Sequence, residues 1–380
     1  MITWVKGDES PSCDPNLAQY SIHHLQRLYC RRTSLPTTWT TMSRFTALNT
    51  DPDKHFHSQQ STRPTGVLLV NLGTPDEPTA PALRRYLAEF LSDPRVVEIP
   101  RVIWWCILHG IILRIRPKKS ALLYKSVWTS EGSPLLVIAK RQAAAIQMVL
   151  GNTASVKLAM RYGNPSIKSV MQAFQDEGLR KIIVLPLYPQ YASPTTGSTF
   201  DELARVLKKW RWVPELHFIN QYFEQPLYIE SLANSIRDYL QQNGQPQKIV
   251  FSYHGMPKCF LLAGDPYYCL CLKTTRLVQE KLGLDKDDCI SSFQSRFGKA
   301  EWLKPYTNEV LRELPAQGIK KIAIISPAFS ADCLETLEEL AVENCHLFIN
   351  AGGESYDYIP ALNDRPDHIH ALASLIRVNL

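Results

Sequence analysis

Hydrophobic residues are sparse in the first part of this chain and regularly grouped in the rest. Residues 1–65 are rich in Ser, Thr, Pro and His and have no sustained apolar period, which predicts a disordered tail. A translation start at Met42 would remove most of this stretch. From Gly66 onward, short runs of Val, Ile and Leu alternate with amphipathic segments.

The apolar runs predict buried parallel strands. A strand that is covered on both faces is apolar throughout, so continuous runs are typical of parallel sheets in βαβ units. Six runs fit this description: Val67–Leu72, Val156–Met160, Ile182–Leu187, Ile249–Ser252, Cys289–Phe293 and Ile322–Ser326. The sequence therefore predicts an α/β fold.

A weak internal repeat divides the chain into two similar halves that meet at about residues 222 to 230. Three pairs of segments recur in the same order: Val67–Pro75 with Ile249–Pro257, Arg161–Gly163 with Arg296–Gly298, and Ile182–Ser193 with Ile322–Asp332. The spacing between the first two segments is longer in the first half. This predicts an insertion there, at about residues 90 to 137.

The insertion carries a short apolar stretch followed by cations. We call Val102–Lys119 the lip; Val102–Leu113 is almost entirely apolar, and Arg114, Arg116, Lys118 and Lys119 follow it. It is too short to cross a bilayer. It is either a core helix with a basic last turn, or an apolar surface lying on a membrane with its cations at anionic headgroups.

Composition narrows the class of protein. The content of 45% hydrophobic and 21% charged residues is ordinary for a globular protein, and a net charge of +6 is too small to indicate nucleic-acid binding. Nine irregularly spaced cysteines fit a reducing compartment better than a disulfide framework. No run of 18 apolar residues and no secretory signal is present, so a cytoplasmic protein is expected.

A file of carboxylates follows one of the predicted strands. Glu335, Glu339 and Glu343 recur every four residues, with Asp332 three residues before the first, so on a helix they share one face. Like charges at this spacing repel one another, so a purely structural helix gains nothing from them. A solvated acidic face is the plain alternative. These carboxylates come just after the predicted strand Ile322–Ser326. This position favours a functional role for them, because ligands of open α/β sheets bind beyond the carboxyl ends of the strands.

His254 has the same position at the end of its own strand, in the turn His-Gly-Met-Pro. Many histidines in such places are structural. If both strand ends open onto one crevice, however, His254 faces Glu335. A neutral imidazole opposite carboxylates suits a divalent metal and also accepts protons. This combination indicates metal-insertion chemistry.

The other candidate motifs give weaker evidence for a functional site. Cys259, Cys269 and Cys271, with the distant Cys289, lack the spacing of a zinc or iron–sulfur site and are expected to be free thiols. Helix capping accounts for Thr195–Thr199. Neither a G-x-G-x-x-G motif nor a Walker A loop is present, so nucleotide chemistry is unsupported.

From Thr65 to Leu380 the chain resembles the ferrochelatase family, in particular its members from Gram-negative bacteria. The matching motifs are Val70–Pro75, Arg161–Pro165, Leu187–Tyr191, Ser252–Pro257, Gly264–Tyr267, Phe293–Arg296, Trp302–Pro305, Ala331–Leu340 and Tyr358–Asn363. So many matches in the same order make the resemblance highly specific.

The resemblance implies a class II chelatase-like fold of two similar Rossmann-like domains, with a porphyrin cleft between them. The first spans residues 66–225 and the second 226–360, and a terminal helix at 361–380 packs back on the first. The family's catalytic histidine falls on His254 and its catalytic glutamate on Glu335, with both at the metal. Glu339, a further catalytic residue, and Glu343 continue as an acidic relay. Substrate-binding positions fall on Leu72, Arg161, Tyr162, Asp332, Arg114 and Lys118, and Arg116 lies with these last two cations where the family meets the propionates.

The implied reaction is the last step of haem biosynthesis, the insertion of Fe²⁺ into protoporphyrin IX with release of two protons. Iron is then a substrate, and no prosthetic group is expected. The chain ends at Leu380 without the cysteine-bearing extension of animal members, so no [2Fe–2S] cluster is expected either. Which of His254 and Glu335 accepts the proton and which holds the metal stays open.

Two alternatives remain beside this reading. A cobalt or nickel chelatase that acts on another tetrapyrrole would share the fold type. A haem carrier would use His254 as an axial ligand, but would have no use for the carboxylate file. The expected location is the cytoplasm, with the lip in peripheral contact with the inner membrane.

Overall fold

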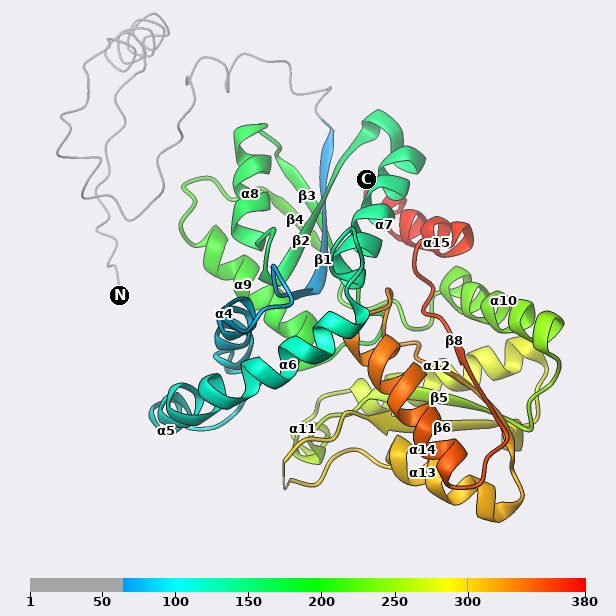
Figure 1. Ribbon diagram of the computed structural model, residues 1–380. Coiled ribbons are helices and arrows are strands. Elements are labelled where there is room, and N and C mark those ends of the chain that lie inside the picture. Colours follow the sequence, from blue (N-terminus) through cyan, green and yellow to red (C-terminus); the bar gives the residue numbers. More distant parts are fainter. Residues whose placement is uncertain (1–63, 299) are drawn as a thin grey trace, which may run out of the picture. The chain divides into compact units, whose positions relative to one another are not determined.

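Two four-stranded parallel sheets organise this protein (Figure 1). The computed structural model describes residues 64–298 and 300–380, which belong to one compact unit. The predicted tail and Met42 lie outside the described residues, apart from the last two positions of the tail. The strands are β1 (Thr65–Thr74), β2 (Ala154–Gly163), β3 (Lys181–Pro186), β4 (Glu215–Phe218), β5 (Lys248–His254), β6 (Cys289–Gln294), β7 (Lys321–Ile325) and β8 (Ser355–Ile359).

The two sheets have the same topology. The strand order is β2-β1-β3-β4 in the first and β6-β5-β7-β8 in the second, and every pairing is parallel. This repeated order confirms the α/β fold of two similar halves. All six predicted strands are present. The sequence missed β4 and β8, which lie at sheet edges and are mostly half-buried, so they lack a continuous apolar run.

Helices cover both faces of each sheet. Along β1, Val67 and Leu69 belong to one core cluster and Leu68 and Val70 to another, which explains the unbroken apolar run. The α-helices are α4 (Ala80–Leu91), α5 (Arg101–Ile107), α6 (Leu113–Val127), α7 (Pro134–Leu150), α8 (Ile167–Asp176), α9 (Ser198–Leu207), α10 (Pro226–Asn243), α11 (Lys258–Leu262), α12 (Tyr267–Leu282), α13 (Thr307–Glu313), α14 (Asn344–Asn350) and α15 (Pro366–Arg377).

Shorter or wider helical segments occur between these elements. The 3₁₀ segments are η3 (Gly151–Thr153), η5 (Lys286–Asp288) and η6 (Leu314–Gln317). The π-helical segments are η2 (Leu108–Ile112), η4 (Ser193–Gly197) and η7 (Glu335–Glu343). Because π-helices are rare and concentrate at functional sites, the nine-residue η7 indicates a functional site around it.

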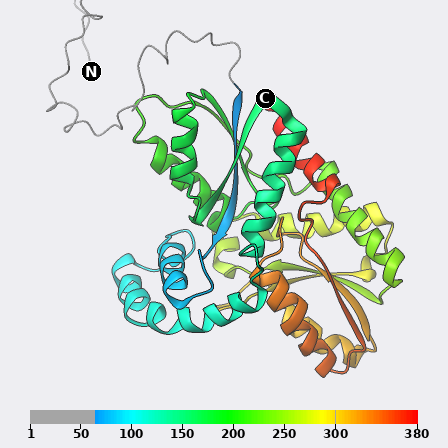
Figure 2. The same ribbon diagram turned by 45° about the horizontal axis from the view of Figure 1, so that its top comes forward.

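One hydrophobic cluster joins the two halves. It contains Leu69 of β1, Phe251 of β5 and Ile376 of α15. Helix α15, red in Figure 2, lies beside α7 and α10. Gln142 of α7 also donates hydrogen bonds to the carbonyl oxygens of Ser330 and Asn363, each at 2.9 Å. The two sheets are therefore held in a defined relation by a shared core.

Two glycines occupy equivalent positions of the repeat and let strand ends approach closely. A Cβ atom on Gly73 would lie 1.8 Å from the carbonyl oxygen of Tyr162, and one on Gly255 would lie 2.6 Å from that of Gln294. Only glycine tolerates such an approach. Each glycine brings the end of a central strand against the end of the neighbouring strand.

The insertion forms α5, η2 and α6, and α6 runs from α5 to the junction of the two sheets (Figures 1 and 2). Trp104 is buried, and its indole N–H donates to the carbonyl oxygen of Leu91 at 2.6 Å. Trp105, by contrast, is 63% exposed and Val102 80%. Within the described residues, no helix has the length and apolarity needed to span a bilayer.

Stability should fall on acidification because of His368 in α15. Burial lowers the pKa of this imidazole to about 4, against partial opposition from the Asn363 carbonyl and Asp367. Between these two pKa values, about 4 in the folded state and about 6.5 in the unfolded state, the unfolded chain binds a proton at His368 and the folded chain does not. We expect a loss of about 2 kcal/mol in unfolding free energy from pH 7 to pH 5.

Urea unfolding at the two pH values measures this slope. In His368→Gln the slope should shrink, whereas His370→Gln, on the exposed side of the same helix, should keep it. Equal slopes in both variants would show that another group causes the pH dependence.

Candidate active site

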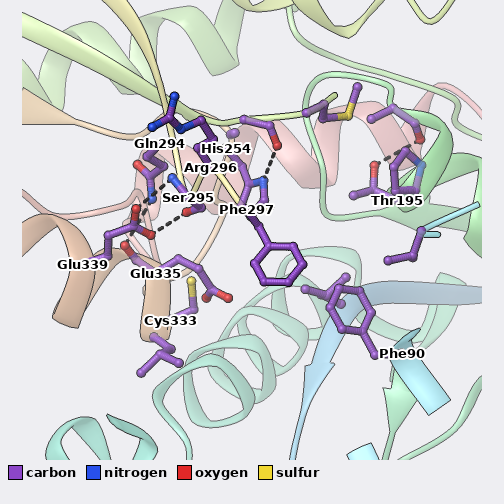
Figure 3. Close-up of a pocket in the computed structure, with 18 of the residues that line it drawn as sticks. Phe90, Thr195, His254, Gln294, Ser295, Arg296, Phe297, Cys333, Glu335 and Glu339 are labelled. Atoms are coloured by element: carbon purple, nitrogen blue, oxygen red, sulfur yellow. Dashed lines mark hydrogen bonds between the residues drawn. The ribbon is translucent and has the colours of Figure 1, made fainter. Parts of the chain in front are cut away.

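A cavity of about 1040 Å³ opens where strands of both sheets end. Its walls include Leu72 in β1, Tyr188 after β3, His254 at the end of β5, Ser295 after β6 and Ala331 after β7. Strand ends from the two halves thus meet in one crevice, as expected for ligand binding in α/β folds. Figure 3 shows the residues around His254.

His254 is the last residue of β5 and has a defined orientation. Its Nδ1 lies 2.8 Å from the carbonyl oxygen of Gly255. Because a carbonyl oxygen only accepts hydrogen bonds, Nδ1 carries a proton, and in the neutral imidazole the lone pair is then on Nε2. The ring lines the cavity, with Phe329 6.3 Å away between ring centroids. The imidazole is therefore arranged to accept a proton or to contact a cation.

Glu335, Glu339 and Glu343 all line this cavity from η7. The predicted common face is present, although the helix is a π-helix and not the expected α-helix. Asp332 does not join that face. It precedes η7, and its carboxylate accepts hydrogen bonds from Thr336 at 2.9 Å, Tyr358 at 2.6 Å and Asn363 at 2.7 Å. The carboxylate file thus has three members.

Glu339 is held by a residue that the sequence analysis did not single out. Ser295 donates to its two carboxylate oxygens, from the backbone N–H at 2.8 Å and from the hydroxyl at 2.5 Å. Burial raises the pKa of Glu339, the Ser295 hydrogen bonds and His254 oppose the rise, and Glu335 adds to it. Ser295 adopts a left-handed conformation with φ of 63°, which is uncommon outside glycine.

Glu335 faces protonated neighbours. Burial raises the pKa of the Cys333 thiol well above its ordinary value, and the negative charge of Glu335 raises it further. Burial and the same charge raise the pKa values of Tyr86 and Tyr124, which also line the cavity. Nothing in the sequence marks Tyr86 and Tyr124 for the site, because only the fold brings α4, α6 and η7 together.

One arginine of the lip lines the cavity. The guanidinium carbon of Arg116 lies 4.5 Å from the ring centre of Phe297, and partial burial lowers the pKa of this side chain. In the described part of the chain, no carboxylate lies within ion-pair distance of Arg116. The resemblance places Arg114, Arg116 and Lys118 together at the propionates; all three are exposed, but Arg114 and Lys118 do not line the cavity. Their contact with substrate stays a prediction.

The remaining predicted substrate residues differ in position. Leu72 lines the cavity. Arg161 and Tyr162 are absent from its walls and lie in a hydrogen-bonded network around Asp93. Asp332 is likewise outside the walls. Their role in binding stays a prediction.

The described residues contain no group of three or more His, Cys, Asp or Glu side chains placed to hold a metal ion. Contact of His254 and Glu335 with the substrate metal therefore stays a prediction, as does the absence of a prosthetic group and of a [2Fe–2S] cluster. Cys259, Cys269 and Cys271 are free thiols.

Comparisons with known proteins agree on one family. The ferrochelatase family model matches residues 64–380. The chain belongs to the ferrochelatase family. It is 60% identical over 315 residues to ferrochelatase 2 of Shewanella oneidensis, covering 82% of this chain and 96% of that protein. It is 54% identical over 319 residues to the ferrochelatase of Marinobacter nauticus, covering 83% and 86%.

Ferrochelatase function in haem biosynthesis, predicted from the motifs, is thereby confirmed. Among solved structures, the sirohydrochlorin chelatase SirB of Bacillus subtilis subspecies spizizenii in complex with cobalt matches with a TM-score of 0.48 and 12% identity, over 83% of this chain and 94% of that chain.

Gly255→Ala tests the close strand contact next to His254. The new Cβ would meet backbone at 2.6 Å, so the turn that orients the imidazole must shift. We expect at least a tenfold loss of kcat, since small misplacements of catalytic groups are costly, and a loss of about 1–3 kcal/mol in unfolding free energy.

Gly110→Ala is the matched control. A Cβ there meets nothing within 4 Å, so activity and stability should stay close to the parent values. A fully active Gly255→Ala variant would show that the turn tolerates displacement and that His254 does not depend on it.

Proposed function

We propose that His254 accepts the two pyrrole protons one at a time, passing the first to the carboxylates of η7 before taking the second, and that Glu335 holds the Fe²⁺ ion as it enters protoporphyrin IX. The observation that carries this assignment is the free Nε2 of His254, in the same cavity as the carboxylates of η7. An imidazole with Nδ1 tied to a carbonyl presents a neutral acceptor, and an anionic oxygen suits a divalent ion. In this proposal His254 is the proton acceptor and Glu335 is the metal ligand.

Glu339 and Glu343 continue from Glu335 as a relay for protons or metal. Burial raises the pKa of Glu339, so this carboxyl binds a proton more readily than an exposed one, and Ser295 holds it in place. A group that gains and loses a proton easily can pass one on. The cavity extends along η7 past Glu343 to Asn344, which supports a route away from the porphyrin.

The cavity also suits a large, mostly apolar macrocycle with acidic side chains. Its volume is at the upper end for small-molecule sites, and its walls include Leu72, Phe90, Val97 and Trp104. Arg116 brings a cation without a carboxylate partner. A porphyrin propionate would pair with it, which makes Arg116 a better candidate than Arg114 or Lys118 for fixing the orientation of the ring.

We propose further that the lip rests on the cytoplasmic face of the inner membrane. Exposed apolar side chains gather on it and on the next turns of α6, among them Val102, Trp105, Ile111, Ile115 and Leu122. The cations Arg114, Lys118 and Lys119 are exposed beside them. This pairing suits an apolar surface with anionic headgroups around it, at the mouth of a site for a lipid-soluble substrate.

Anaerobic mixing of protein, Fe²⁺ and protoporphyrin, followed by loss of porphyrin fluorescence, tests the catalytic roles. His254→Ala and Glu335→Gln should each lose about 10²–10⁴ in rate while still binding porphyrin, because each removes a positioned group. Glu339→Gln, farther along η7, should lose less. The variant that combines His254→Ala with Glu335→Gln should be scarcely slower than the slower of the two single variants, since the rate losses of residues that act as one unit do not add.

Glu338→Gln is the matched control, because Glu338 belongs to η7 but does not line the cavity. It should keep nearly full activity. Near-parent turnover by His254→Ala or Glu335→Gln would overturn the assigned roles and would leave the family membership untouched.

Membrane contact is tested with two adjacent tryptophans. Trp105→Ser removes an exposed ring, so binding to anionic liposomes should weaken while the melting temperature stays unchanged. Trp104→Ser removes a buried ring and its hydrogen bond, so the melting temperature should fall. Liposome binding that is unaffected by Trp105→Ser would show that the lip does not reach the membrane.

A further inference from the structure

The segment between α4 and α5 forms one wall of the cavity and the base of the lip. Val96, Val97, Glu98 and Ile99 line the cavity, and α5 starts at Arg101. We call residues 92–97 the lip base. Its backbone turns around Asp93, whose carbonyl oxygen accepts from the N–H groups of Val96 at 3.1 Å and Val97 at 3.0 Å. The position of Asp93 therefore determines where this wall stands.

Asp93 is a buried anion with a full set of donors. Its side chain is 4% exposed. Oδ2 accepts from Arg161 at 2.5 Å, from the Tyr162 hydroxyl at 2.9 Å and from the Ser198 hydroxyl at 2.6 Å, and Oδ1 accepts from the Arg95 backbone N–H at 2.8 Å. Burial alone would raise the pKa of Asp93, but Ser198, Arg95, Tyr162 and Arg161 together lower it.

The side chain of Arg161 belongs to the same hydrogen-bonded network around Asp93. It lies at the end of β2, and its side chain is 12% exposed. Besides the ion pair with Asp93, its Nε donates to the carbonyl oxygen of Ser198 at 3.0 Å and to the Ser198 hydroxyl at 2.7 Å. The guanidinium also packs over the ring of Tyr162, with 4.4 Å from its carbon to the ring centre. These contacts join the lip base to the first sheet and to α9.

A second, outer ion pair connects the same segments. Arg95 donates to both carboxylate oxygens of Asp201, at 2.5 and 3.0 Å, and to the Ser193 hydroxyl at 3.1 Å. These side chains are 35% and 48% exposed. Exposed pairs of this kind contribute little, because water screens them, whereas a buried pair that loses one partner leaves an uncompensated charge.

From this geometry, and resting on the proposed placement of porphyrin in this cavity, we infer that Arg161 and Asp93 are positioning residues. They fix the lip base, and with it the porphyrin-binding wall, without touching the substrate. Arg161 is therefore not a porphyrin ligand. When the ion pair is lost, the wall should be in its binding conformation for only part of the time. The apparent affinity for porphyrin then falls in proportion to that fraction, while the rate of the bound complex is preserved.

The test separates affinity from turnover. Asp93→Asn and Arg161→Lys should each raise the porphyrin KM, and the Kd measured by fluorescence quenching, by about tenfold if the wall is competent a tenth of the time. The kcat at saturating porphyrin should change less than twofold. Amide hydrogen exchange in residues 92–100 should speed up, which a ligand role for Arg161 would not cause.

Asp201→Asn is the matched control, because it breaks the exposed pair on the same segment and should leave KM within twofold. If Asp93→Asn does not fold, Tyr162→Phe and Ser198→Ala keep the ion pair and each remove one hydrogen bond to Asp93. They should raise KM two- to threefold with faster exchange at the lip base.

The inference would be overturned if Arg161→Lys lowered kcat without changing KM and Asp93→Asn changed neither constant. Arg161 would then be a residue that contacts the substrate. Unchanged exchange and unchanged KM in both milder variants would overturn it as well.

Discussion

The parallel pairing of both sheets is the constraint on which this site depends. Parallel strands place all their carboxyl ends at one edge, and the shared core of α7, α10 and α15 turns these edges of the two sheets toward one cavity. Gly73 and Gly255 let the central strands end against their neighbours in each half. His254 and the residues of η7 reach the same space for this reason, although they are far apart in the sequence.

Charge is distributed unevenly around that cavity. The carboxylates of η7 stand on one side with His254, and Ser295 tethers the central one. Arg116 stands at the lip and lacks a carboxylate partner among the described residues, while burial keeps Tyr86, Tyr124 and Cys333 protonated. The site therefore offers carboxylates that suit a dication and, at the lip, a guanidinium that suits an acidic group of a macrocycle, while Arg296 and Arg312 also line the cavity.

A second layer of residues supports the walls. Asp332 accepts hydrogen bonds from Thr336, Tyr358 and Asn363 beside the start of η7, much as Asp93 accepts them within the lip base. Both are buried aspartates next to cavity-lining segments. Motif resemblance alone places Arg161, Tyr162 and Asp332 at the substrate, because a motif does not distinguish residues that hold a wall in place from residues that touch the ligand.

The sequence by itself determined the alternation of strands and helices, the repeat and the strand-end positions of His254 and the η7 carboxylates, because burial on both faces leaves unbroken apolar runs and ligand residues follow them. It could not reveal β4 and β8, whose half-buried surfaces carry no such run. It also could not distinguish Trp104 from Trp105, or Arg116 from Arg114 and Lys118. Neighbouring residues of one type differ only in the direction of the side chain, and the packing of α5 and α6 on α4 decides that direction. Ser295 and Tyr124 entered the site, and Asp93 the network that supports its wall, only through the tertiary structure, since their partners come from distant elements that no local pattern connects.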